Sequence, residues 1–262
     1  MKSTSDQIKD IKNHGYTLDF STVFNHAFEN YKKIAVYAGL MLLVFSVFFG
    51  AIAYLILVAA FGIDKLTNAN FLNIQPQNLS QIQLVLYIVG TAFASAIMGP
   101  FTAGFLKMAD CAEKDVEFNV STIFSYYKSS HFSQIFVATF LISLFSVITS
   151  TFLEILKLNA VGFVFSLLLS FFTFLTIPLI VFGNLKAVEA IKSSFIVITK
   201  QPMVLIGLII TILGAILVGF CAFCIGVLFT IPFSYSMTYA IYCSIFNIDK
   251  QDPIDSIGQS DF

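Results

Sequence analysis

The longest stretch without a charged residue constrains the fold of this chain most. Residues 201–248 contain no Asp, Glu, Lys or Arg along 48 positions. At a rise of 1.5 Å per residue, one helix of that length would be about 72 Å long, more than twice the ~30 Å of bilayer hydrocarbon. The stretch therefore predicts two membrane spans joined by a turn, which we place between Gly219 and Gly226.

Four further segments are apolar over the length of a span, so the sequence predicts an all-α fold, a polytopic transmembrane bundle of six helices. The predicted spans are residues 34–62, 82–106, 132–153, 160–183, 203–222 and 227–247, within one transmembrane domain of residues 18–248. The composition agrees, because 58% of the residues are hydrophobic and 11% are charged, whereas soluble domains are about 25% charged. Several charges precede the long first apolar run, so we expect an uncleaved first span and no signal peptide.

Three segments with helical periodicity predict amphipathic interfacial helices, residues 20–33, 118–130 and 185–200. In the first, one face is polar and includes His26, Asn30 and Lys32. The opposite, apolar face consists of Phe20, Val23, Phe24, Ala27, Tyr31 and Ile34. The polar residues 1–17 and the acidic tail, residues 249–262, are predicted to be disordered.

Short matches within the sequence indicate three repeated units. Ser-Thr-Val-Phe occupies 21–24 and Ser-Thr-Ile-Phe 121–124, while Thr-Ile-Pro occurs at 176–178 and 230–232. We expect each unit to be a surface helix followed by a two-span hairpin, with one proline in the returning helix. These prolines are Pro100, Pro178 and Pro232.

A proline inside a helix removes one hydrogen bond and frees the carbonyl four residues earlier. The freed carbonyls would be those of Ala96, Phe174 and Leu228, and a hydroxyl, water or ligand must satisfy them. Two interpretations remain open. The kinks serve helix packing, or they converge on a central pathway or hinge, as broken helices do in transporters.

Tyr235, Tyr239 and Tyr242 share one face of the sixth predicted span. Such a stripe favours bundle packing or an interfacial belt, and the alternative is a face that lines a pore or contacts lipid. No catalytic, cofactor-binding or metal-ligating pattern stands out. Cys221 and Cys224 have redox or metal spacing but lie among apolar residues. We therefore expect no enzyme, no cofactor and no metal site.

Charge limits both the partners and the orientation. All 14 cations are lysines and the net charge is −1, so the chain has neither guanidinium clamps nor a basic field for nucleic acid. Twelve of the lysines fall on the side of the two termini, and only Lys65 and Lys157 fall on the other. The positive-inside rule then predicts that both termini are cytoplasmic. No ionisable group lies near the middle of a predicted span, which disfavours ion-coupled transport.

A surface helix at Phe20–Lys33, paired spans, Gly99-Pro100 in the second span and Thr-Ile-Pro-Phe followed by tyrosines at 230–242 form a recognisable order. In this order the chain resembles the uncharacterised six-span bacterial inner-membrane proteins related to the membrane domain of glycerophosphoryl diester phosphodiesterases. The resemblance covers residues 18–248 and implies a place in the bacterial cytoplasmic (inner) membrane. In the fused proteins a separate soluble domain carries out catalysis, so the resemblance implies no active site here.

The sequence supports two hypotheses about function. The first is a non-enzymatic membrane component that organises lipid or binds a partner, with the lipid bilayer, another membrane protein or a second copy of the chain as its partner. The alternative is a transporter or channel for an uncharged or lipid-like solute through the proline-kinked helices. An enzyme embedded in the membrane comes third.

Overall fold

The computed structural model describes residues 3–61, 76–221 and 225–246, and within these ranges the regular structure is entirely helical. The α-helices are α1 (Thr4–His14), α2 (Phe20–Phe61), α4 (Gln81–Glu113), α5 (Val120–Phe124), α6 (Phe132–Ile155), α7 (Asn159–Thr173), α8 (Thr176–Val181), α9 (Ala187–Lys200), α10 (Pro202–Cys221) and α11 (Ile225–Phe246). Two 3-10 helices, η1 (Pro76–Asn78) and η2 (Ser125–Tyr127), complete the list. The predicted tail lies outside the described residues, as do Cys224 and the middle of the predicted turn after Cys221.

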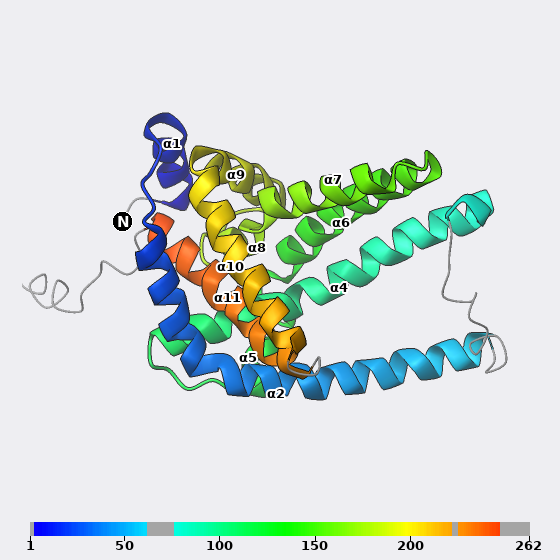
Figure 1. Ribbon diagram of the computed structural model, residues 1–262, viewed down its shortest axis with the longest axis horizontal. Helices are drawn as coiled ribbons and strands as arrows, with labels where there is room; N and C mark the ends of the chain where they lie inside the picture. The colour runs from blue at the N-terminus through cyan, green and yellow to red at the C-terminus, as the bar shows by residue number, and fades with distance from the viewer. Residues whose placement is uncertain (1–2, 62–75, 222–224, 247–262) are drawn as a thin grey trace, which may run out of the picture.

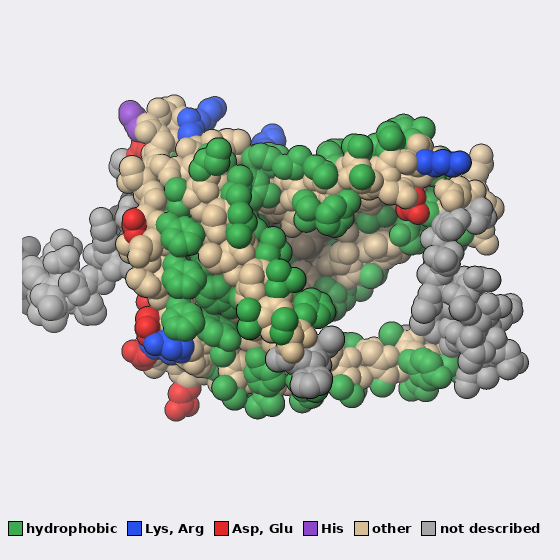
Figure 2. All heavy atoms as spheres, in the orientation of Figure 1, with side chains coloured by type: hydrophobic (Ala, Val, Ile, Leu, Met, Phe, Trp, Pro, Cys, Tyr) green, Lys and Arg blue, Asp and Glu red, His purple; other side chains and the backbone are tan. Residues whose placement is uncertain are grey.

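Among the described residues, six helical segments are long and apolar enough to cross a membrane, which matches the predicted number of spans. They are Phe20–Leu55, Gln81–Glu113, Phe132–Ile155, Asn159–Val181, Pro202–Cys221 and Ile225–Phe246. In Figure 1, α1, α9 and the C-terminal ends of α4 and α11 gather toward the left, while the α6–α7 turn lies at the right. In Figure 2, charged side chains lie toward these two ends, and the surface between them is largely hydrophobic. This distribution is the one expected of a membrane-spanning bundle.

The first predicted interfacial helix is not a separate element, because α2 runs without interruption from Phe20 to Phe61. Figure 1 shows that α2 changes direction, so that its first part runs beside α11 and its later part extends away from it. The N–H of Thr22 donates to the Asp19 carboxylate at 2.7 Å just before this helix. That bond and a second one from the Thr22 hydroxyl lower the pKa of Asp19.

The first part of α2 also corrects the predicted polar face. Val23, Ala27 and Ile34 are buried as expected, but so is Asn30, which is 1% exposed. His26 is half-buried. The sequence pattern placed both polar side chains toward water, and it could not anticipate that α4 and α11 supply polar groups to meet them. The other two predicted interfacial segments correspond to α5 with η2, and to α9.

The prediction that residues 1–17 are disordered is wrong for the described part, because Thr4–His14 form α1. The Ser3 side chain accepts a hydrogen bond from the N–H of Asp6 and so caps the helix start. Gly15, at φ 74°, ends the helix in a conformation that favours glycine. Ile8 and Ile11 are buried in the main core, so tertiary packing holds a segment whose composition alone predicts disorder.

The returning helices differ from the predicted spans at their ends. Helix α4 continues to Glu113, seven residues past the predicted limit, and its buried C-terminal part joins the core. The predicted span 160–183 is two helices, because α7 ends at Thr173 and α8 begins at Thr176. Close packing fixes α5 on α4, since a Cβ added to Gly104 would lie 2.6 Å from the Ile123 Cα.

Candidate functional site

Pro100 and Pro232 both lie inside continuous helices, α4 and α11, and both are buried. At each proline a tyrosine hydroxyl from another element donates to the carbonyl three residues earlier. Tyr127 donates to Ile97 O at 2.8 Å, and Tyr31 donates to Phe229 O at 3.1 Å. The sequence predicted free carbonyls one residue earlier, at Ala96 and Leu228. Because a proline kink opens a whole helical turn, the next carbonyl also becomes accessible to an outside donor.

Pro178 is placed differently, as the third residue of the short helix α8. The first N–H groups of a helix have no acceptor within it, so a proline in the first turn sacrifices no hydrogen bond. The second unit therefore has a helix break in place of a kink. Here the Ser194 hydroxyl of α9 donates to Phe172 O, near the end of α7, at 2.8 Å.

These three contacts, which we call the hydroxyl contacts, follow a cyclic order. The donor Tyr127 of η2 bonds α4, the donor Ser194 of α9 bonds α7, and the donor Tyr31 of α2 bonds α11. Each predicted surface segment thus holds the returning helix of the preceding unit, and the first segment holds the last helix. Among the described helices, α2 and α11 form the most extensive interface, which closes the three units into a ring.

The predicted tyrosine stripe packs inside the bundle. Tyr235 stacks on Phe105 of α4 with ring centroids 4.9 Å apart. Tyr242 packs against Phe182 at 5.5 Å and is 1% exposed. The Tyr239 hydroxyl donates to the Asp110 carboxylate at 3.2 Å. All three side chains therefore contact other parts of the protein.

A buried amide lies at the centre of the polar contacts between α2, α4 and α11. The Asn30 amide nitrogen donates to Ala109 O at 2.8 Å and to the Glu113 carboxylate at 3.1 Å, and the amide oxygen accepts from Ser236 at 2.8 Å. His26 Nε2 lies 3.1 Å from Glu113 Oε2. This arrangement satisfies the oxygen and both donors of Asn30, so it acts as a structural connection between three spans.

Asp110 is 3% exposed. With the groups around Asn30, its contacts form a polar cluster between α2, α4 and α11. Lys107 Nζ lies 2.7 Å from one carboxylate oxygen, and Lys114 Nζ lies 2.6 Å from the other, which also accepts from Tyr239. Both oxygens thereby have cationic partners, and the charge is compensated. Through Tyr239, this carboxylate also links the end of α4 to α11.

Sequence reasoning missed this cluster because its members come from three distant helices. Periodicity placed Asn30 on the polar face of residues 20–33, and no sequence pattern singled out Asp110. One signal was available, since Lys107 and Lys114 stand three and four residues to either side of Asp110, the spacing that brings side chains together on a helix.

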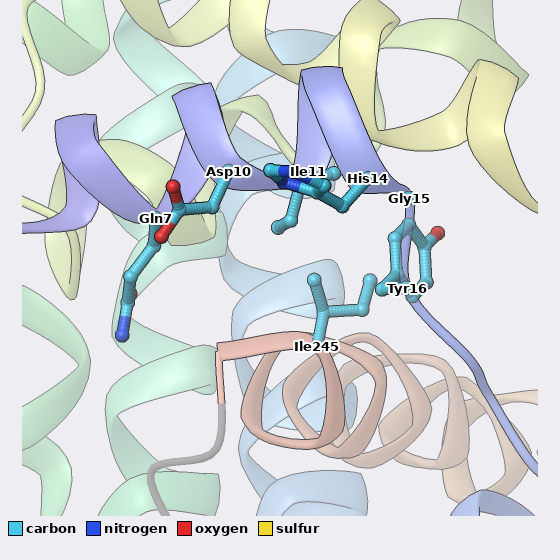
Figure 3. Close-up of a pocket in the computed structure, with 7 residues that line it drawn as sticks. All are labelled: Gln7, Asp10, Ile11, His14, Gly15, Tyr16 and Ile245. Atoms are coloured by element: carbon cyan, nitrogen blue, oxygen red, sulfur yellow. The ribbon is translucent and has the colours of Figure 1, made fainter.

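One cavity of about 310 Å³ lies between α1 and the end of α11. Its lining consists of Gln7, Asp10, Ile11, His14, Gly15, Tyr16 and Ile245. Figure 3 shows the Asp10 carboxylate directed toward Gln7 and away from the His14 ring. The two side chains therefore do not converge on a common point, and none of the predicted prolines or tyrosines lines this cavity.

Within residues 3–61, 76–221 and 225–246, no group of three or more His, Cys, Asp or Glu side chains is placed to hold a metal ion. No protein family, no curated protein and no solved structure matches this chain. The six apolar helices, with the polar cluster at one end of the bundle, identify the chain as a multi-pass helical membrane protein.

Proposed function

We propose that this protein is a non-enzymatic component of the bacterial cytoplasmic membrane that organises lipid or binds partner proteins. Both termini lie in the cytoplasm in this proposal. The lysine distribution supports the orientation, because twelve of 14 lysines belong to segments on one side of the membrane. The relation to the membrane domain of glycerophosphoryl diester phosphodiesterases remains part of the proposal and rests on the sequence order described above.

The hydroxyl contacts are the observation that carries this proposal. A transport pathway through a kinked helix needs a solute-accessible face at the kink, where freed carbonyls can bind what passes. Pro100 and Pro232 are buried, and tyrosines from neighbouring elements donate to the carbonyls three residues earlier. Kinks that receive hydrogen bonds from their own protein favour a packing role over a pathway.

Substitution of the prolines in reconstituted liposomes tests this proposal. We expect the wild-type protein to add no glycerol flux above that of protein-free liposomes. Pro100→Ala and Pro232→Ala should change only the apparent melting temperature. Flux through the wild-type protein that disappears in either variant, while the variant keeps its fold, would establish the transporter alternative and refute the proposal.

Lipid retention provides the positive half of the test. Native mass spectrometry in mild detergent should show phospholipid bound to the intact chain after exhaustive delipidation steps that strip an unrelated six-span protein. A chain that releases all phospholipid under those conditions, and that binds no membrane-protein partner, contradicts the proposed role.

A further inference from the structure

Three phenylalanines form an aromatic ladder along the first part of α2. Phe20 and Phe24 stack with centroids 6.2 Å apart and planes within 5°, and Phe24 and Phe28 do so at 6.2 Å and 7°. Phe20 is 41% exposed and Phe28 is 43% exposed. Two outer rings with this exposure are costly in water, so the ladder needs an apolar neighbour.

The ladder occupies one of three faces on this part of α2. A buried face with Val23, Ala27 and Asn30 contacts the bundle, and an exposed polar face carries Ser21, Thr22, Asn25 and Glu29. The rings lie between these two faces. Around the helix, a face that contacts protein is followed by an apolar face and then by a polar face. This order is typical of a helix at the boundary between hydrocarbon and water.

The ladder continues the apolar surface of α10. A Cβ added to Gly207 would lie 3.4 Å from the Phe20 ring, so this ring rests on α10. Next to it, Met203 and Ile210 of α10 are 81% and 60% exposed. Since α10 is the most apolar of the six candidate spans, its exposed side chains face acyl chains, and the ladder extends that surface toward the polar end of the molecule.

Two opposite charges lie at the end of the ladder. Lys32 Nζ is 5.6 Å from the centroid of the Phe28 ring and 2.7 Å from a carboxylate oxygen of Glu29. Both side chains are more than half exposed. An ammonium and a carboxylate beside an apolar strip complement a headgroup that carries a phosphate and an ammonium above its acyl chains.

We propose that the aromatic ladder, with Lys32 and Glu29, binds a zwitterionic phospholipid of the phosphatidylethanolamine type at the membrane surface. The rings contact the glycerol region and upper acyl chains, Lys32 contacts the phosphate, and Glu29 contacts the headgroup ammonium. This inference rests on the proposed lipid-organising function and names the lipid class and the surface that would serve it.

A photo-crosslinking amino acid on the full chain tests this surface. Benzoylphenylalanine replaces Phe28, in the ladder, or Asn25, on the polar face of the same helix, and the chain is reconstituted in nanodiscs of equal phosphatidylethanolamine and phosphatidylglycerol. Intact mass after irradiation should show phospholipid adducts at position 28 and none at position 25. Replacement at Ile210 serves as the positive control for acyl contact.

The lipid composition of the adducts tests the headgroup assignment separately. We expect the adducts at position 28 to be enriched about twofold in phosphatidylethanolamine over the nanodisc mixture, the scale of an exposed ion pair, and Lys32→Gln to remove the enrichment. Adducts with a second copy, or none at position 28 while position 210 reacts, overturn the inference. Unenriched adducts overturn the headgroup assignment. If the inference fails while the chain still retains phospholipid in native mass spectrometry, the proposed function stands without it.

Discussion

The sharpest test of the fold is a single methyl group at Gly104. A Cβ at this position in α4 would lie 2.6 Å from both the Cα and the carbonyl carbon of Ile123 in α5, and backbone atoms cannot rotate away as a side chain can. Such overpacking costs about 1–3 kcal/mol. For a chain of this size, that loss lowers the melting temperature by about 2–12 °C. Gly104→Ala should therefore destabilise the protein, although alanine favours helices.

A matched glycine in the same helix supplies the control. Gly90 has no atom within 4 Å of an added Cβ, so Gly90→Ala should leave the melting temperature unchanged or raise it, because alanine is the better helix former by up to about 1 kcal/mol. A thiol-reactive dye can follow unfolding through the buried Cys111 and Cys243. Equal or higher melting of Gly104→Ala relative to the wild type would refute the docking of α5 on α4.

Four further outcomes follow from the polar contacts and the topology. Tyr127→Phe removes the hydroxyl contact from η2 to α4 and should cost about 0.5–1 kcal/mol, whereas Tyr87→Phe, a control within α4, should cost nothing in the same melting assay. Asp110→Asn leaves two half-exposed lysines to rehydrate and should cost on the order of 1–3 kcal/mol; an unchanged melting temperature would show that the cluster contributes no stability. Folding lowers the pKa of Asp19, so the stability that its carboxylate contributes is present above its unfolded pKa of about 3.9 and is lost as the pH falls through the folded pKa. Asp19→Asn should keep the helix cap and abolish this acid-dependent loss of stability. Impermeant maleimide on intact cells should label the exposed Cys221, and labelling only after the cells are opened would reverse the proposed orientation.

The sequence was sufficient for the six spans because each depends on local composition. Forty-eight uncharged residues can satisfy their backbone groups in a membrane only as helices, so α10 and α11 followed directly. The repeat of Pro100 and Pro232 in returning helices was also readable, because a proline has the same local effect wherever it occurs.

What the sequence could not supply was the partner of each polar side chain. Asn30 has the periodicity of a solvated residue, yet it is buried because Ser236, more than 200 positions later, bonds its oxygen. Tyr127 and Ile97 are only 30 positions apart, but nothing in their local patterns identifies one as donor to the other. Such pairings depend on how helices pack, and periodicity carries no information about them.

The pairing of the first long helix with the last has a consequence for biosynthesis. Tyr31 and its acceptor Phe229 are separated by 198 positions, so at 5–20 residues per second a ribosome needs about 10–40 s to supply the missing partner. During that interval Asn30 and Tyr31 are already made while α11 does not yet exist. Until then, these groups must stay hydrated at the bilayer surface or be sheltered by the insertion machinery. A chain that ends before α11 would lack the partners of Asn30 and Tyr31 permanently, even if its earlier spans were inserted correctly.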